Sequence, residues 1–311
     1  MLVSLALLLL GALAAVVAPR LLSRAEWPER EPVVALWVWQ CAVATVLLSF
    51  ALSMVFSAAA SWLAVRGHVF APAPSGVVEA YAFGSHRPWS TVLTILLASG
   101  GLWTAAMLTR EIHRARRRRA RRREELLVRS PVMPGEEPGR QPLVVLEGER
   151  PGAWWLPGTA PQLAITTAAL QRLKGRQLDA LLAHEQGHAR ARHDWLLHCS
   201  GALANGFPQV PVFAAFRDEM HRLVELAADD VASRRFGRLT IALALVELNE
   251  DRGVFGPGAA PGAGLRQRVN RLLSPVPRLT AGRRLRLTAA AALVPVVPVL
   301  IAFVPALRAL G

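Results

Sequence analysis

The stretch LDALLAHEQGHARARHDW, residues 178–195, predicts the helix around which the rest of the chain is organised. His184 and His188 are four residues apart, so on a helix both imidazoles project from one face and can share one Zn²⁺. Glu185 lies one residue along, where it can take a proton from a zinc-bound water that the metal has made acidic. These three residues predict a hydrolytic zinc site.

The neighbouring residues favour this interpretation. An apolar helical face, with Leu178, Leu181 and Leu182, leads into the motif, and its far end is polar. Gly187 is the weak point, because a glycine inside a helix costs about 1 kcal/mol relative to alanine. The competing interpretation is a solvated helix that carries two incidental histidines.

The composition is that of a membrane protein. The chain has 311 residues, of which 53% are hydrophobic, and its mean hydropathy is +0.32. This is too apolar for an ordinary soluble protein of that length. The two cysteines, Cys41 and Cys199, fall in unrelated segments, so neither a disulfide framework nor a thiolate metal cluster is expected.

Four apolar segments are long enough to cross a bilayer. They are residues 2–19, 33–65, 89–109 and 283–311. The first three form a predicted membrane domain at 1–110, and the fourth follows the rest of the chain. Positive charge comes after the first segment and not before it, which favours a membrane span over a cleaved secretory signal. The prolines of the fourth segment are tolerated in a membrane helix if neighbouring groups satisfy the freed backbone.

Arginines predict the orientation of these spans. Arg20, Arg24 and Arg30 occupy the connector between the first two spans, and eight arginines lie between residues 114 and 123, directly after the third. The positive-inside rule places both regions in the cytoplasm and the N-terminus outside. Each arginine near anionic lipid contributes about 1 kcal/mol. The net charge of +14 could instead indicate a nucleic-acid partner, but no recognised motif accompanies it, so no direct nucleic-acid contact is expected.

The region between the third and fourth spans predicts a cytoplasmic α+β domain. Residues 111–141 are a basic juxtamembrane segment and a linker rich in proline and glycine, and residues 142–282 form the predicted zinc-peptidase domain. Three short strands are expected before the motif helix, at 142–146, 153–156 and 162–166. Zinc peptidases of this kind commonly bind an extended substrate against a sheet edge. The fold class is therefore mainly α, with the peptidase domain inserted between the third and fourth of four transmembrane helices.

A second helix, predicted at 217–236, offers the remaining ligand. Glu225 and Asp229 are four residues apart on one face. A carboxylate is the expected third protein ligand beside two histidines, so Glu225 is assigned to the metal. Asp229 is expected to accept the other ring N–H of a ligand histidine. The alternative is a solvated acidic face, but the helix is otherwise apolar. His221 and His193 are candidates for stabilising the oxyanion or for an auxiliary role.

Two further segments stay open in the sequence. Residues 196–216 are apolar and contain glycine and proline, so they could form a buried hairpin or a re-entrant segment that touches the bilayer. Residues 253–264 have the composition of a loop or lid, and residues 265–273 predict a short amphipathic helix.

The two motifs together resemble the membrane-embedded gluzincin peptidases of the BlaR/MecR antirepressor type. The resemblance rests on His184-Glu185-x-x-His188 and on LVELAADD at 223–230, with support from Arg-Leu-Leu at 271–273 and from the order of the spans. It implies His184, His188 and Glu225 as zinc ligands, Glu185 as general base and Asp229 as the partner of a ligand. In several members the substrate is a winged-helix repressor. The sensor members continue into an extracellular ligand-binding domain, whereas this sequence stops at Gly311, so a β-lactam sensor role is not expected.

The expected activity is hydrolysis of peptide bonds in a cytoplasmic protein by a multi-pass zinc endopeptidase of the cell membrane, with the bilayer and a protein or peptide as its partners. One alternative is a quality-control protease similar to the heat-shock or prenyl-protein endopeptidases. Another is a non-catalytic membrane scaffold that retains the fold. The oligomeric state is not predicted.

Overall fold

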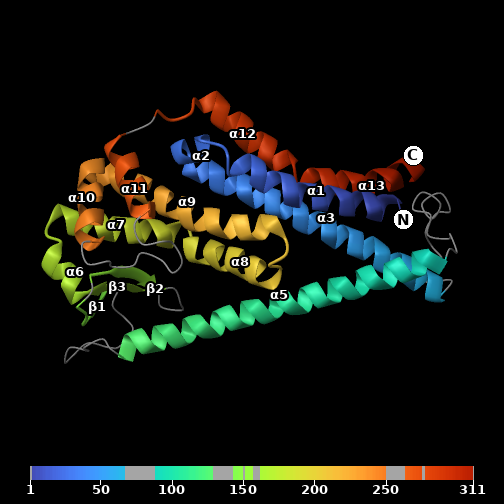
Figure 1. The fold of residues 1–311 in the computed structure, drawn as a ribbon, viewed down its shortest axis with the longest axis horizontal. Coiled ribbons are helices and arrows are strands. Elements are labelled where there is room, and N and C mark those ends of the chain that lie inside the picture. Colours follow the sequence, from blue (N-terminus) through green and yellow to red (C-terminus); the bar gives the residue numbers. More distant parts are fainter. Residues whose placement is uncertain are drawn as a thin grey trace.

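The computed structural model of the chain describes residues 2–66, 88–128, 143–149, 151–156, 162–249, 263–274 and 277–310. The protein is elongated and mainly helical (Figure 1). Long apolar helices occupy one end, and a small sheet with shorter helices occupies the other. This confirms the mainly α class.

The first two predicted spans are long apolar helices. They are α1 (Leu2–Leu22) and α3 (Pro32–Arg66), joined through the single turn of α2 (Trp27–Arg30). Both are long and apolar enough to cross a membrane, in α3 over Pro32–Ala59. The two pack against each other, and Ser53 Oγ donates a hydrogen bond to the Ser4 carbonyl at 3.0 Å. Leucines at the outer face of α1, such as Leu9 and Leu13, are exposed, as expected for a surface that meets lipid.

The predicted fourth span is bent in the structure. It consists of α12 (Ala281–Leu293) and α13 (Val296–Leu310), whose axes differ by 41°. The bend falls at Val294 and Pro295, because proline has no backbone N–H to continue the helical hydrogen bonds. Both helices pack on α3. If the bent pair counts as one span, the described residues contain three candidate spans.

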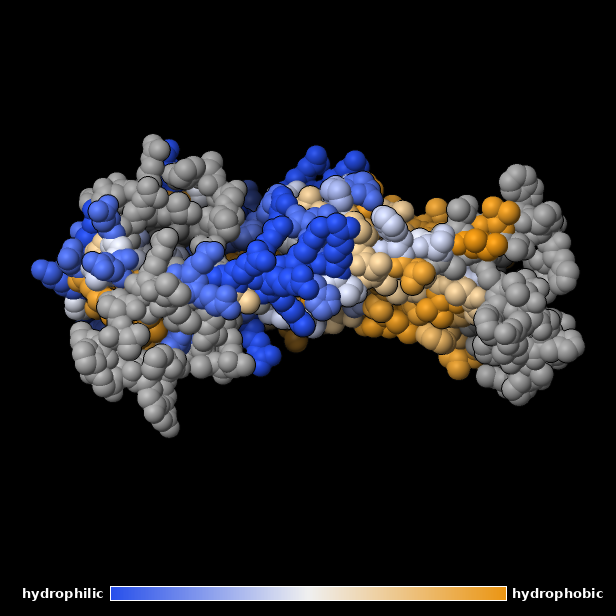
Figure 2. Space-filling model, turned by 90° about the horizontal axis from the view of Figure 1, so that it is seen from below, coloured by the Kyte–Doolittle hydropathy of each residue, from blue (hydrophilic) through white to orange (hydrophobic). Residues whose placement is uncertain are grey.

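Helix α5 (Pro88–Val128) joins the predicted third span to the basic segment without a break. Many side chains of its apolar half, residues 89–109, lie outside the described residues, and the third span stays a prediction. The arginines of its second half whose side chains the structure describes, among them Arg114, Arg116 and Arg121, are exposed and contribute to a hydrophilic band next to the apolar end of the molecule (Figure 2). Residues 129–141 of the predicted juxtamembrane segment and linker lie outside the described chain.

The small sheet has three strands, close to the predicted positions. They are β1 (Leu143–Leu146), β2 (Ala153–Leu156) and β3 (Gln162–Thr166), in the order β1-β3-β2. The central strand β3 is buried along its whole length, parallel to β1 and antiparallel to β2. One edge is therefore β2, which packs against the helix that carries the histidines.

The predicted motif helix is divided into two helices. After α6 (Thr167–Arg172), α7 runs over Arg176–Arg190 and α8 over His193–Gly206. The prediction of a single helix to Trp195 is wrong, because Arg192 adopts a left-handed conformation with φ of 52° and turns the chain. His193 thereby begins a new helix instead of ending the first.

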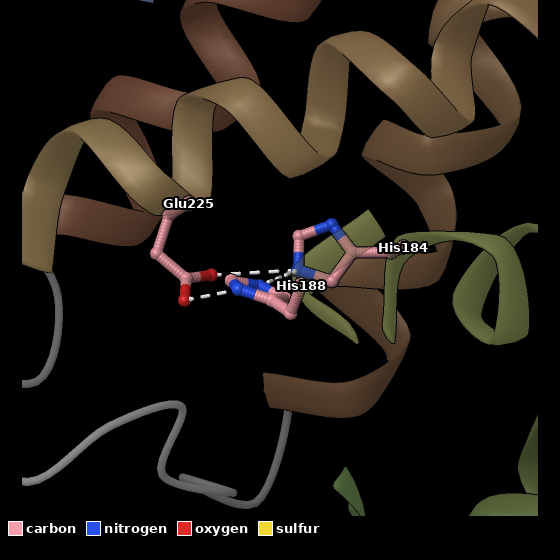
Figure 3. A group of neighbouring side chains, drawn as sticks. All are labelled: His184, His188 and Glu225. Carbon is pink, nitrogen blue, oxygen red and sulfur yellow. Dashed lines mark hydrogen bonds and ion pairs between the residues drawn. The ribbon is translucent and has the colours of Figure 1, made fainter. Parts of the chain in front are cut away.

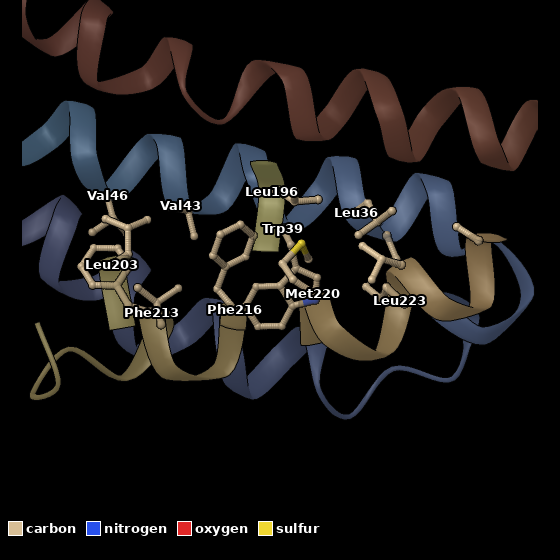
Figure 4. Close-up of a cluster of buried hydrophobic side chains, with 14 of the residues drawn as sticks. Leu36, Trp39, Val43, Val46, Leu196, Leu203, Phe213, Phe216, Met220 and Leu223 are labelled. Carbon is tan, nitrogen blue, oxygen red and sulfur yellow. The ribbon is translucent and has the colours of Figure 1, made fainter. Parts of the chain in front are cut away.

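Helix α9 (Pro211–Phe236) forms a hairpin with α8 and packs on α3. The largest apolar core lies at this junction, with Trp39 and Val43 of α3 facing Phe213, Phe216 and Met220 of α9 (Figure 4). Residues 196–216 thus form a helical hairpin with a buried inner face, and contact of this hairpin with the bilayer stays a prediction. Gly201 does not interrupt α8.

Two helices complete the second end of the molecule. They are α10 (Arg238–Asn249), which packs on α7 and α9, and α11 (Ala263–Leu273), which packs on α10. A second apolar core, with Leu181 of α7 and Leu248 of α10, joins α7 and α10 to β3 through Ile165. Residues 253–262 of the predicted loop lie outside the described residues.

Candidate metal centre

Helices α7 and α9 meet at the two sequence motifs, and Gly187 lies at their contact. A Cβ atom at Gly187 would lie 3.6 Å from the Ala228 Cα and 3.7 Å from the Ala228 Cβ. Small residues on both helices therefore let the backbones approach each other. The glycine that weakens the helix pattern in the sequence occupies this close approach.

His184, His188 and Glu225 converge on one point (Figure 3). Their ligand atoms all lie within 4.8 Å of one another. Glu225 Oε2 is 3.5 Å from His184 Nε2, and Glu225 Oε1 is 3.5 Å from His188 Nε2. The two Nε2 atoms are 3.1 Å apart. The structure thus brings together the three residues that the sequence predicts as ligands.

This donor set fits a zinc ion. Two imidazole nitrogens on one tetrahedral Zn²⁺, each about 2.0–2.1 Å from the metal, lie roughly 3.3 Å from each other. The observed separation of 3.1 Å is close to that value. Two histidines and one carboxylate leave a fourth position for water, as catalytic zinc sites require.

Asp229 holds the first histidine. Its Oδ1 lies 3.1 Å from His184 Nδ1, and its side chain is fully buried. When Nδ1 carries the proton that Asp229 accepts, the lone pair of Nε2 is free and faces Glu225. Burial opposes charge on His184, but hydrogen bonds to Asp229 and Glu225 outweigh it and raise the pKa of the imidazole to about 10 in the metal-free protein. The site is therefore arranged to hold one positive charge at Nε2.

His193 contacts the second histidine. Its Nδ1 is 3.0 Å from His188 Nδ1, and the two rings are in edge-on contact with centroids 4.9 Å apart. Burial lowers the pKa of His188 to about 3 and that of His193 to about 4, so both rings are neutral near pH 7. One of the two Nδ1 atoms must donate to the other. As with His184, the outer nitrogen is occupied and Nε2 points to the shared site.

Arg268 of α11 ties the two carboxylates together. Its Nη1 is 2.7 Å from Glu225 Oε2, while its Nη2 and Nε bind the two oxygens of Asp229 at 2.7 and 2.8 Å. The guanidinium is buried, as is Asp229. Burial opposes ionisation of Glu225 and Asp229, but Arg268 outweighs it and holds the pKa of both carboxyls below their ordinary values. Both acids are therefore anionic and fixed in orientation.

Glu185 lies on the sheet side of the histidines. Its side chain is buried, and its carboxylate accepts a hydrogen bond from the Trp155 backbone in β2. Burial raises the pKa of this carboxyl to about 7, against the opposing charge of His184. A carboxylate with that pKa can both accept and return a proton near neutral pH.

The remaining predicted site residues fall in different places. His193, a candidate oxyanion donor in the sequence, instead contacts His188 through Nδ1. His221 lies one turn before Glu225 on α9, and within the described residues no hydrogen bond or ion pair joins it to the centre. The sequence motifs did not identify Arg268 as part of the centre. A signal for it exists in the sequence, because Arg268 shares the apolar face of α11 with Leu265, Val269 and Leu272, and an arginine on a buried face needs buried counterions.

Comparisons with known proteins agree with this centre. The model of peptidase family M48 matches residues 115–281, which is more than half of the chain and includes the helices that carry all three candidate ligands. Searches of curated proteins and of solved structures found no match. The match names M48 and not the BlaR/MecR-type antirepressors. M48 peptidases are metal-dependent, and the chain brings two histidines and a glutamate to one point inside the matched region. The chain therefore belongs to peptidase family M48.

Proposed function

We propose that the protein is a membrane-anchored zinc endopeptidase that hydrolyses peptide bonds of a protein substrate at the cytoplasmic face. The observation that carries the proposal is the meeting of His184, His188 and Glu225 beside Glu185, whose pKa of about 7 suits a general base. The two apolar N-terminal helices support membrane association.

In this mechanism His184, His188 and Glu225 would hold the metal, and Asp229 and His193 fix the two imidazoles. When bound there, zinc would supply Lewis acidity toward the scissile carbonyl and toward water. Glu185 accepts the proton of the attacking water at its carboxylate and passes it to the leaving amine nitrogen. Arg268 keeps Glu225 and Asp229 ionised and correctly oriented.

Strand β2 is the proposed docking edge for the substrate. It is an edge strand that packs against α7, and the Trp155 backbone touches Glu185. An extended peptide that pairs with this edge would lie beside the general base. Main-chain pairing provides affinity with little dependence on sequence, which suits an endopeptidase.

The proposed topology has four spans, with the N-terminus outside and the peptidase region in the cytoplasm. The arginine-bearing ends of α1, α5 and α12 all point toward the end of the molecule that holds the sheet (Figure 1). The positive-inside rule then assigns that end to the cytoplasm. Labelling of single cysteines placed at Glu26 and at Glu149 in intact cells tests the orientation. Both positions are expected to be protected until the membrane is permeabilised, and labelling of either one in intact cells would contradict it.

The family resemblances of the sequence suggest two substrate classes. One is a winged-helix repressor, whose cleavage would be regulatory, and the other is misfolded membrane protein, whose cleavage would be quality control. Profiling of cleaved proteins in membranes separates them, because a regulatory enzyme yields one principal product whereas a quality-control enzyme yields many.

The activity is tested with Glu185→Gln in the purified full-length protein. This change removes the base but keeps the size of the side chain, so zinc content should stay that of wild type while casein cleavage falls about 10²–10⁴-fold. The matched control is Glu147→Gln, an exposed glutamate after β1, which should cleave at the wild-type rate. Cleavage by Glu185→Gln at the wild-type rate would show that the mechanism is wrong.

Metal analysis separates an enzyme from a scaffold that retains the fold. His188→Ala is expected to lose most of its zinc, because it removes one of three protein ligands. An unchanged zinc content in that variant would exclude the ligand assignment.

A further inference from the structure

A concave site lies close to the metal centre along the chain, because Asp230 and Arg271 line it. It is a cleft of about 540 Å³, formed by α2, the C-terminal half of α9, α11 and the start of α10, with Ser274 and Arg278 after α11. Its walls carry five arginines and two acids. The arginines are Arg30, Arg238, Arg266, Arg271 and Arg278. Neither the catalytic proposal nor the packing of the spans uses this excess of positive charge.

Some of the arginines are already held in place. Asp230 accepts from Arg271 at 2.8 and 3.0 Å and from Arg278 at 3.3 Å. Arg271 Nε also donates to the Glu29 carbonyl at 2.7 Å. The Glu29 carboxylate is occupied by Gln267 and Arg222, at 2.6 and 3.3 Å. The two acids of the cleft are therefore both engaged, and Arg271 is held by Asp230 and by the Glu29 carbonyl.

The other three arginines are uncompensated. Within the described residues, the side chains of Arg30, Arg238 and Arg266 make no ion pair and no hydrogen bond to another side chain. They come from three different helices, α2, α10 and α11, and surround the same space. With two acids shared among five arginines, the cleft carries a net excess of three positive charges.

We propose that this cleft binds a phosphate group. Guanidinium groups donate planar pairs of hydrogen bonds that match phosphate oxygens, and several of them around one concavity suit a compact ligand of high negative charge. The phosphate can belong to the headgroup of an anionic lipid or to a soluble compound. An acidic polypeptide is less suited, because its carboxylates are spread along a chain whereas these arginines face one cavity.

The cleft shares its walls with the metal centre. Asp230 follows Asp229 directly on α9, and Arg271 lies one turn after Arg268 on α11. A ligand that draws Arg271 or Arg278 away from Asp230 therefore acts on the elements that position the metal centre. These are α9, which carries Glu225 and Asp229, and α11, which carries Arg268. The binding proposal itself does not depend on the proposed peptidase activity.

The test compares two double variants of the full-length protein in an uncharged detergent. Arg238→Ala with Arg266→Ala removes two uncompensated charges from the cleft. The control, Arg234→Ala with Arg235→Ala, removes two exposed charges at the end of α9 that do not line it. The probes are pyrophosphate, short-chain phosphatidylglycerol, short-chain phosphatidylcholine and polyglutamate, with affinity measured by calorimetry and by the thermal shift of unfolding.

The expected result is that wild type and control bind a phosphate probe, and that the cleft variant binds it on the order of a hundredfold more weakly. Replacement of the same two residues by lysine should retain part of the affinity and shows that a loss is not caused by misfolding. Binding of pyrophosphate indicates a soluble ligand, and selective binding of phosphatidylglycerol over phosphatidylcholine indicates a lipid headgroup. The proposal is overturned if cleft and control variants bind every phosphate probe equally, if wild type binds none, or if only polyglutamate distinguishes the variants.

Discussion

Replacing Arg268 by methionine tests the least expected part of the centre. Methionine fills a similar volume but leaves two carboxylates without their cation. Arg268 makes three contacts of 2.7–2.8 Å to Glu225 and Asp229, and Asp229 is fully buried. Breaking a buried ion pair by removing one partner costs about 3–5 kcal/mol, because the remaining charge is left unpaired. The melting temperature of the metal-free protein should therefore fall on the order of 10 °C.

The effect should depend on metal. When zinc is present its charge lies beside Glu225, so only Asp229 lacks compensation beyond His184, and the loss of stability should be smaller than in the metal-free protein. The assay is thermal unfolding of the purified protein in detergent, with chelator and with added zinc. Lysine at this position should be intermediate, because one ammonium cannot reproduce the three contacts.

The control is Arg266→Ala, an exposed arginine on the same helix, which should change stability by no more than about 0.5 kcal/mol. Combining Arg268→Met with Asp229→Asn should cost less than the sum of the two changes, because the second removes the charge that the first leaves unpaired. If Arg268→Met without metal unfolds at the temperature of Arg266→Ala, the ion-pair reasoning is refuted.

Three other outcomes are expected. Gly187→Ala should leave stability unchanged or raise it by up to about 1 kcal/mol, because the atoms nearest to the added Cβ lie at ordinary contact distance. Gly187→Val should lower stability, and a marked loss with alanine would contradict the packing of α7 on α9. His193→Phe should weaken zinc binding about 10–100-fold, measured against a competing chelator, and an unchanged affinity would show that its contact with His188 has no role. The pKa of His184 is about 10 in the metal-free protein, so zinc must displace its proton, and the apparent affinity for zinc should rise about tenfold per pH unit between pH 7 and 9. Calorimetry in buffers of different ionisation enthalpy should show the release of one proton, and a zinc affinity that does not change with pH would disprove the reasoning.

The local pattern of the chain predicted most of the elements and the three residues that converge at the centre. A spacing of four residues places His184 with His188, and Glu225 with Asp229, on single helix faces, and this holds whatever the rest of the fold does. The strands could be recognised because turn-forming residues bound short apolar runs. These features depend on residues that are close in sequence.

What the sequence did not predict depends on distant or unusual contacts. The pairing of Arg268 with Asp229 spans 39 residues, and nothing near either residue identifies its partner. The break between α7 and α8 occurs at an arginine in left-handed conformation, where the usual signal of a glycine is absent. The sequence predicts His193 as an auxiliary residue near the motif, but its contact with His188 depends on the turn at Arg192.

The packing of α9 on α3 means that the hydrolytic region is not a separable module. A soluble fragment that began at residue 142 would retain α9 but lose α3, and the side chains of Phe213, Phe216 and Met220 would face water. Exposing each of them costs roughly 1.5–3 kcal/mol, and the sum is comparable to the whole stability of a typical domain. Such a fragment should aggregate on expression, whereas the full-length chain in detergent or lipid keeps its catalytic helices supported. The smallest autonomous unit of this enzyme therefore includes part of what would otherwise be regarded as its anchor.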